Sequence, residues 1–314
     1  MTPAPSPYHG GRMDEPPLPP APPLETCYRH PEERTAVHCT RCGRPICPAC
    51  MVPAPVGHHC QTCVEEARRE FRRGGLRVGA RGLSATRVLL GAVVAMFLLE
   101  VALGGPGSFA GGSARTLVDL GALVPVLVAT GQWWRLLTAM FLHAGFLHLA
   151  LNAYALWLFG TLVEGTYGRW RFLAIYLVSG FLGSVASYAF GGLDVATLTS
   201  VGVGASGAIV GLLGAFIAYN YRRRHHAIAW ANLRWALTII LINVVFGLTF
   251  PGVDNKAHLG GLLAGMAAGS LADGVGPARS RPLTRVLGFA GLVALGVALA
   301  AWRTAVIRTR LAAL

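Results

Sequence analysis

Four polar residues stand out because they lie in apolar segments, where polar side chains are costly and are functional candidates by default. They are Ser206, His258, His148 and Asn152. A serine hydroxyl is a weak nucleophile unless a neighbouring base takes its proton, and a histidine does this near neutral pH. His148 and Asn152 are four residues apart, so they share one helix face and can both donate hydrogen bonds to an oxyanion. The set predicts acyl-transfer chemistry, with Ser206 as nucleophile and His258 as general base.

Glycines surround the candidate nucleophile in the stretch SVGVGASGAIVGLLGAF, residues 200–216. Gly204 and Gly207 allow a tight entry into a helix that begins near Ser206, where free N–H groups favour developing negative charge. Small residues at helical spacing follow Ser206, and Gly261 and Gly265 form a similar ridge after His258. Facing ridges would bring the two side chains within reach of each other. Taken singly, each feature has an ordinary role in helix packing or backbone hydrogen bonding; their joint occurrence favours a site.

The composition indicates that a polytopic membrane protein must position these residues. Of 314 residues, 54% are hydrophobic and only 13% are charged, whereas soluble domains are about a quarter charged. We predict an all-α membrane protein with six core transmembrane helices, a seventh C-terminal helix and a small N-terminal module. The predicted membrane segments cover residues 88–104, 142–163, 171–190, 204–221, 232–250, 257–273 and 284–302.

The distribution of arginine predicts the orientation of these segments. Arginines cluster before the first segment and in every second loop thereafter, while the alternate loops nearly lack them. The positive-inside rule places the N-terminus in the cytoplasm and the C-terminus on the outer side. The predicted location of the protein is the plasma membrane. The four polar residues then lie at similar depth near the outer face. The basic tail is discordant: either it is an exception, or the seventh segment does not fully cross.

The net charge of +13 follows from these loop arginines, so no nucleic-acid partner is expected. The first residues lack the basic start and apolar stretch of a cleavable signal peptide. We predict a disordered Pro-rich N-terminus, a zinc-binding module, a basic cytoplasmic linker, a membrane core, a seventh helix and a C-terminal tail. Their boundaries are 1–26, 27–66, 67–86, 87–273, 283–303 and 304–314.

All seven cysteines lie in one short N-terminal stretch, which favours a metal site over a disulfide framework. Four ligand pairs with two-residue gaps each suit one edge of a zinc tetrahedron, so the set suits two structural Zn²⁺ ions. Interleaved and sequential pairing both remain open, as do an iron–sulfur cluster, a single zinc with spare cysteines, and His58 or His59 as a ligand. The predicted ligands are Cys27, His30, Cys39, Cys42, Cys47, Cys50, Cys60 and Cys63.

Residues 87–273 resemble the rhomboid intramembrane serine proteases. The resemblance rests on GASG at 204–207, AHLGGLLAG at 257–265, HLALN at 148–152, WWR at 133–135 and GTLVEGTYG at 160–168. It implies a rhomboid-like bundle that cleaves transmembrane segments of other membrane proteins, with no cofactor for catalysis. It also implies a Ser206–His258 dyad without an aspartate, and an oxyanion site made by His148, Asn152 and the Ser206 backbone N–H.

Further positions take roles from the same resemblance. Trp134 and Arg135 would belong to a membrane-embedded first loop, Glu164 would be structural, and His143 would support the site near a water-filled cavity. The chain departs from the family at Val210, where many members carry an aromatic residue packed against the base. This departure puts the way in which His258 is oriented in doubt.

The cysteine module resembles B-box zinc fingers, which favours interleaved pairing and suggests docking of a cytoplasmic protein, or regulation. Two other functions compete with proteolysis: a rhomboid-like pseudoenzyme that binds membrane helices without cutting them, and a transporter. Intact Ser206 and His258 argue against the first. The second lacks a detectable inverted repeat or a charged pathway, although Glu100 places an acidic residue near the outer end of the first predicted helix.

Overall fold

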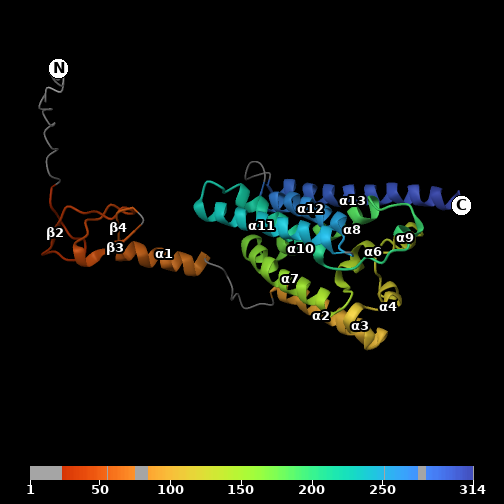
Figure 1. The fold of residues 1–314 in the computed structure, drawn as a ribbon. Helices are drawn as coiled ribbons and strands as arrows, with labels where there is room; N and C mark the ends of the chain where they lie inside the picture. The colour runs from red at the N-terminus through yellow and green to blue at the C-terminus, as the bar shows by residue number, and fades with distance from the viewer. Residues whose placement is uncertain (1–22, 55, 75–83, 251, 275–280, 314) are drawn as a thin grey trace, which may run out of the picture. The chain divides into compact units, whose positions relative to one another are not determined.

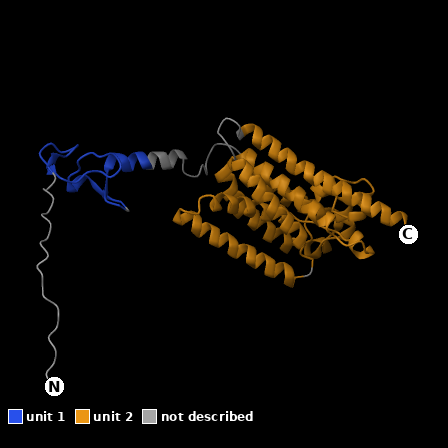
Figure 2. Ribbon diagram, turned by 90° about the horizontal axis from the view of Figure 1, so that it is seen from above, with its two compact units in different colours: residues 1–77 blue, residues 78–314 orange. Residues whose placement is uncertain are grey.

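The computed structural model describes residues 23–54, 56–74, 84–250, 252–274 and 281–313. The chain forms two compact units, Met1–Arg77 and Val78–Leu314 (Figure 2). Most of the predicted disordered N-terminus and the middle of the predicted basic linker lie outside the described residues.

The N-terminal unit contains short strands that the sequence analysis did not predict. Strand β1 (Glu25–Thr26) pairs antiparallel with β2 (Arg34–Thr35), and β3 (Met51–Pro53) pairs antiparallel with β4 (His58–Cys60). A 3₁₀ turn, η1 (Pro48–Cys50), precedes β3, and helix α1 (Gln61–Gly74) follows β4. Because β1 falls within residues 1–26, the prediction of disorder is wrong for its last residues. Cysteines and Ile46 form the small buried core of this unit.

Each predicted membrane segment of the second unit corresponds to a helix (Figure 1). Five helices are long and apolar enough to cross a membrane, while α10 is apolar but shorter, at 16 residues, and α12 is not among the five. The structure therefore describes a mostly helical membrane protein with five apolar spans, and the count of seven spans remains a prediction. The seven helices are α2 (Ala85–Gly104), α7 (Phe146–Tyr167), α8 (Arg169–Ala189), α10 (Ser206–Tyr221), α11 (Ala227–Thr249), α12 (Asn255–Asp273) and α13 (Arg281–Ala312).

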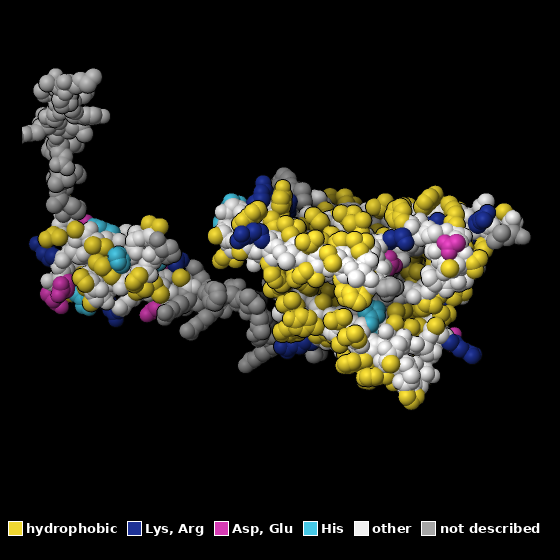
Figure 3. Space-filling model, in the orientation of Figure 1, with side chains coloured by type: hydrophobic (Ala, Val, Ile, Leu, Met, Phe, Trp, Pro, Cys, Tyr) yellow, Lys and Arg dark blue, Asp and Glu magenta, His cyan; other side chains and the backbone are white. Residues whose placement is uncertain are grey.

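Helix α10 lies at the centre of the bundle. It packs against α7, α8, α11 and α12, and most of its side chains are buried. By contrast, α11 leaves large apolar side chains such as Leu241 and Leu248 exposed. Hydrophobic side chains cover much of the visible face of this unit, and Lys and Arg gather towards its two ends (Figure 3). Because α10 is largely surrounded by other helices, it does not need the length of a helix that faces lipid along its whole course.

Short helices fill the loop between α2 and α7. They are α3 (Gly107–Gly111), α4 (Ala114–Asp119), α5 (Pro125–Ala129), α6 (Arg135–Thr138) and the 3₁₀ turn η2 (Ala139–Phe141). One more, α9 (Val195–Leu198), lies between α8 and α10. The loop between α8 and α10 joins the first loop through Gly202, which exchanges two backbone hydrogen bonds of 2.9 Å with Leu123.

The basic C-terminus is helical rather than a separate tail, because α13 continues to Ala312. With 32 residues, α13 is about 48 Å long, well beyond a hydrocarbon core of about 30 Å. Its arginines contact loop carbonyls: Arg303 donates to Gly191 and Gly192, both at 2.6 Å, and Arg308 donates to Ala129 at 2.7 Å. The end of α13 thus lies beside α5 and the loop that follows α8, and Arg303 and Arg308 have structural partners there.

Candidate active site and metal centre

Ser206 and His258 meet where α10 and α12 begin. Ser206 Oγ lies 2.9 Å from His258 Nε2, although the two residues are 52 positions apart. Ser206 is the first residue of α10, so its hydroxyl lies beside free helix N-terminal N–H groups. This geometry allows the imidazole to accept the serine proton.

The chain enters α10 through a glycine that no other residue could replace without strain. Gly204 has φ +126°, and its N–H donates to the Ala139 carbonyl at 3.0 Å. A Cβ at this position would lie 2.8 Å from His148 Nε2. The imidazole of His148 therefore lies against the backbone two residues before Ser206, and this close approach requires glycine.

His148 and Asn152 lie one turn apart on α7, but they relate differently to Ser206. His148 Nδ1 accepts a hydrogen bond of 3.3 Å from the Ala144 N–H, which leaves Nε2 towards Gly204. Asn152 is buried, and its Nδ2 donates to the His148 carbonyl at 2.9 Å. Among the residues that the structure describes, neither side chain hydrogen-bonds to Ser206. A second N–H of Asn152 Nδ2 is free for another acceptor.

Two facing glycine ridges hold α10 and α12 together at short range. A Cβ on Gly261 would overlap the carbonyl oxygen of Gly207, and one on Gly265 would overlap that of Gly211. A Cβ on Gly207 would lie 3.3 Å from the carbonyl oxygen of Ala257. This backbone contact sets the helix separation that lets Ser206 reach His258.

The other predicted motif residues lie away from the dyad and tie loops together. Arg135 is buried and donates to the carbonyls of Val118 at 2.7 Å and Ala122 at 2.8 Å, whereas the neighbouring Trp134 is exposed. Near the far end of α7, the Glu164 carboxylate accepts hydrogen bonds from the start of α2. Its partners are Ser84 Oγ (2.6 Å), the Ala85 N–H (2.8 Å), the Thr86 N–H (2.9 Å) and Thr86 Oγ1 (2.7 Å).

Asp254 is a neighbour of the site that the sequence analysis missed. It caps α12, since its Oδ1 accepts from the Ala257 N–H at 3.0 Å and its backbone carbonyl accepts from the His258 N–H at 3.0 Å. Its second carboxylate oxygen accepts from Ser187 Oγ of α8. This contact fixes the start of α12 one turn before His258, and the N-cap type and spacing of Asp254 were the signal in the sequence.

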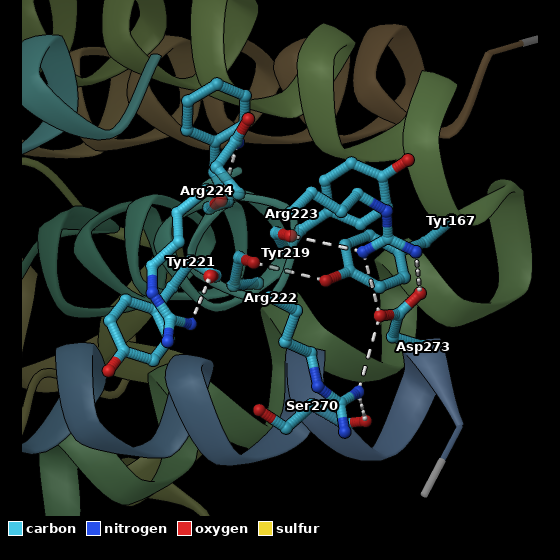
Figure 4. Close-up of polar contacts among 11 residues, drawn as sticks. Tyr167, Tyr219, Tyr221, Arg222, Arg223, Arg224, Ser270 and Asp273 are labelled. Atoms are coloured by element: carbon cyan, nitrogen blue, oxygen red, sulfur yellow. Dashed lines mark hydrogen bonds and ion pairs between the residues drawn. The ribbon is translucent and has the colours of Figure 1, made fainter. Parts of the chain in front are cut away.

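The opposite ends of α10 and α12 carry a larger polar cluster (Figure 4). Asp273 binds Arg223 through two hydrogen bonds of 3.0 Å and Arg222 through one of 3.3 Å. The Arg223 guanidinium lies 3.7 Å from the Tyr219 ring centroid. Tyr167 joins α7 to this cluster by donating to the Ala215 carbonyl at 3.1 Å. The cluster therefore ties together the three helices that carry the predicted site residues.

The metal-ligand pairs of the N-terminal unit are interleaved. The first cluster joins Cys27 and His30 with Cys47 and Cys50, and the second joins Cys39 and Cys42 with Cys60 and Cys63. Within each cluster the ligand atoms lie within 4.8 Å of one another. His30 Nδ1 is 3.2 Å from Cys47 Sγ, and Cys42 Sγ is 3.7 Å from Cys60 Sγ. A tetrahedron with Zn–S bonds of about 2.3 Å has edges of about 3.8 Å, so these groups fit such an ion.

The environment of the thiols also suits metal binding. None of the seven cysteines forms a disulfide. Burial disfavours the Cys27 thiolate, but backbone N–H groups, including that of Cys47, outweigh it and lower the Cys27 pKa to about 6. Cys39 behaves in the same way. Burial raises its pKa, but hydrogen bonds from N–H groups such as that of Cys60 outweigh burial and lower the pKa to about 6. Burial and the neighbouring thiols raise the Cys50 pKa to about 11. This is expected where several thiols lie close together, because their negative charges repel one another until a cation binds.

Comparison with known proteins agrees with this architecture. Residues 130–272 match the family model of the Rhomboid domain. The chain is 43% identical to the rhomboid protease GluP of Bacillus subtilis (strain 168) over 180 residues, which are 56% of this chain and 32% of GluP. It is 43% identical to the mitochondrial RHOMBOID-like protein 6 of Arabidopsis thaliana over 163 residues, 51% of each protein. The chain thus spans a third to a half of these relatives.

A third relative is covered more fully. The rhomboid protease AarA of Providencia stuartii is 32% identical over 206 residues, which are 60% of this chain and 71% of AarA. The family-model match includes both Ser206 and His258. The chain therefore belongs to the rhomboid family.

Proposed function

We propose that the chain is an intramembrane serine endopeptidase that cleaves transmembrane segments of other membrane proteins. One observation carries the proposal: Ser206 Oγ lies 2.9 Å from His258 Nε2 at the N-terminus of a buried helix. Membership of a family that includes named proteases supports it. A pair of this kind activates a serine for attack on a carbonyl.

In the proposed reaction, Ser206 Oγ attacks the scissile carbonyl carbon while His258 Nε2 takes the hydroxyl proton. The C–O bond forms and the carbonyl oxygen becomes an oxyanion. His258 then returns the proton to the leaving amine as the C–N bond breaks, which gives an acyl-enzyme. Water hydrolyses the ester by the same base, and Ser206 is regenerated.

We assign the oxyanion to three donors: the backbone N–H of Ser206, His148 Nε2–H and the free N–H of Asn152. The position of His148 against Gly204 and the helix N-terminus at Ser206 support this assignment. Donors of this kind are typically worth about 3 kcal/mol each in transition-state stabilisation. Substrate segments must unwind to reach Ser206, so helices weakened by small residues are the expected substrates.

We propose six core transmembrane helices and a seventh, with the N-terminus cytoplasmic and the site opening to the outer side of the plasma membrane. The arginine-rich loops support this orientation. The carbonyl contacts of Arg303 and Arg308 support an outer C-terminus despite its basic residues, because these two arginines bind the loops locally.

A cleavage assay tests the proteolytic function. Purified protein in lipid vesicles is expected to cleave a labelled transmembrane substrate that contains Gly or Pro in its segment, and Ser206→Ala is expected to abolish cleavage. Ser270→Ala, the same change near the other end of α12, serves as the matched control and should retain activity. Equal cleavage by Ser206→Ala would refute the mechanism, and substrate binding without cleavage by the wild type would identify a pseudoenzyme.

We also propose that each Cys/His cluster holds one structural Zn²⁺, which would cross-link a unit with little core of its own. The unit would then dock a cytoplasmic protein or regulate the protease. Metal analysis of the full-length protein should give about two zinc ions per chain, as two clusters require. A value of about one would overturn the assignment, and removal of metal by a chelator should unfold this unit while the helical unit stays intact.

A further inference from the structure

Glu100 is a buried acidic residue in α2 that the proposed mechanism does not use. It is 3% exposed in an apolar helix, and none of the ion pairs found among the described residues includes it. Its Oε1 accepts a hydrogen bond of 3.1 Å from the backbone N–H of His143. Its Oε2 is buried and has no hydrogen-bond partner in the described part of the chain. An acidic residue in such a place is a functional candidate.

His143, whose backbone N–H binds Glu100, has two more unpartnered polar atoms. Its side chain is completely buried, and neither ring nitrogen has a hydrogen-bond partner among residues that the structure describes. An unsatisfied buried polar group costs about 1–3 kcal/mol, and native proteins satisfy such groups with buried water that has two to four polar partners. Glu100 Oε2 and the two ring nitrogens of His143 are such groups, and the two residues are joined by the hydrogen bond from the His143 N–H.

The peptide that follows connects this place to the site. Ala144 N–H donates to His148 Nδ1 at 3.3 Å, directly after the His143 N–H that donates to Glu100. A neutral imidazole nitrogen that accepts a hydrogen bond leaves the proton on the other nitrogen. His148 Nε2 therefore carries the proton and presents it beside Gly204. The His143 ring also packs edge-on against the His148 ring, with 5.2 Å between centroids.

From these contacts we infer that Glu100 and His143 form a buried water-binding site, and that Glu100 is a positioning residue for His148. The Glu100 carboxyl holds the loop at residues 143–144, and this loop fixes His148 in the tautomer that donates from Nε2. The role of that donor in catalysis rests on the proposed function. The carboxyl acts as a hydrogen-bonding group, so a neutral amide can replace it and an apolar side chain cannot.

Three variants in α2 test the inference through kcat and KM for cleavage of the model substrate. Glu100→Leu should lower kcat about tenfold with KM unchanged. The loss is smaller than the roughly 10²–10³-fold cost of removing one oxyanion donor, because His148 is misplaced but still present. Glu100→Gln should stay within about threefold of the wild type, because the amide oxygen still accepts the His143 N–H. Leu89→Ala, also buried in α2, should lower thermal stability without lowering kcat.

The outcomes separate this inference from the proposed protease function. If the wild type cleaves and Glu100→Leu stays within about twofold of it, or if Leu89→Ala loses kcat equally, the positioning role is wrong. If the wild type cleaves nothing, the proposed function fails, and ¹⁵N-histidine NMR of the wild type still decides the inference. A His148 protonated at Nδ1 would overturn it, as would a high-resolution structure in which protein atoms fill the space between Glu100 Oε2 and the His143 ring. The NMR test also applies if Glu100→Leu does not fold.

Discussion

The two ends of the α10–α12 pair differ in how polar groups connect them. Where the helices begin, Ser206 and His258 share one contact of 2.9 Å. About 25 Å away along α10, Asp273 joins two arginines at once, and the Tyr219 ring stacks against the guanidinium of Arg223 (Figure 4). Between the two ends the helices touch through glycine backbones.

This difference indicates that one end of the helix pair stabilises the packing and the other end carries the reactive groups. A nucleophile and its base must exchange a proton, so the reactive end needs direct contact between these two groups. The Asp273 cluster has no such demand, and its charge-assisted hydrogen bonds can fix the helices relative to one another. The register set at that end and along the glycine ridges is what places Ser206 against His258.

The largest expected effect comes from breaking the contact at the reactive end. His258→Ala should lower kcat by about 10⁴-fold or more, because the serine loses its base. The thermal unfolding midpoint should stay close to that of the wild type, since one hydrogen bond is worth about 1 kcal/mol. Cleavage rates and unfolding curves, measured on the same preparation, check this. Residual cleavage above about 1% of the wild-type rate would contradict the assignment of the base.

A change in the glycine ridge should affect both ends. Gly265→Ala forces a methyl group into the Gly211 carbonyl, so the helices must separate. We expect a loss of about 2 kcal/mol in the free energy of unfolding and about a tenfold loss of cleavage, because small displacements of catalytic groups are costly.

Gly291→Ala in α13 is the matched control for this change, since a Cβ there meets nothing within 4 Å. It should leave both quantities unchanged. If Gly265→Ala has no greater effect than Gly291→Ala, the close approach of α10 and α12 does not position the dyad.

At the charged end, Asp273→Asn should reduce stability more than activity. The substitution keeps the shape of the side chain but removes the charge that pairs with Arg223, at an expected cost of about 2 kcal/mol. Chemical unfolding at low and high salt measures this cost. Asp194→Asn, at the exposed N-cap of α9, is the control and should cost less than about 1 kcal/mol. A fall in kcat as large as that of His258→Ala would mean that the two ends are not distinct.

The smallest effect is expected for Arg222→Ala. Arg222 makes a single longer bond of 3.3 Å to Asp273, and a partly exposed pair of this kind contributes about 0.5 kcal/mol. Arg223→Ala should cost more, since it loses two bonds of 3.0 Å and its contact with Tyr219. Unfolding free energies of the two variants decide the order, and the reverse order would assign the anchoring role to Arg222.

Much of the architecture could be predicted because the length and apolar composition of a membrane helix can be recognised in the sequence. The existence of all the long helices follows from this signal, and most of their ends lie within about four residues of the prediction. The end of α13 was missed because its arginines resemble a polar tail, whereas carbonyls of distant loops accept their hydrogen bonds. The strands of the N-terminal unit were missed because two or three residues carry no periodicity.

The sequence by itself determined which residues could react: a serine at a glycine-rich helix start, a histidine before a second glycine ridge, and paired metal ligands at two-residue gaps. Only the tertiary structure decided which groups meet. It interleaved the ligand pairs, placed Asp254 against Ser187, and joined Glu100 to the loop that holds His148. Local spacing encodes a helix face or a ligand pair, but contacts between residues 43 or 67 positions apart depend on how whole helices pack.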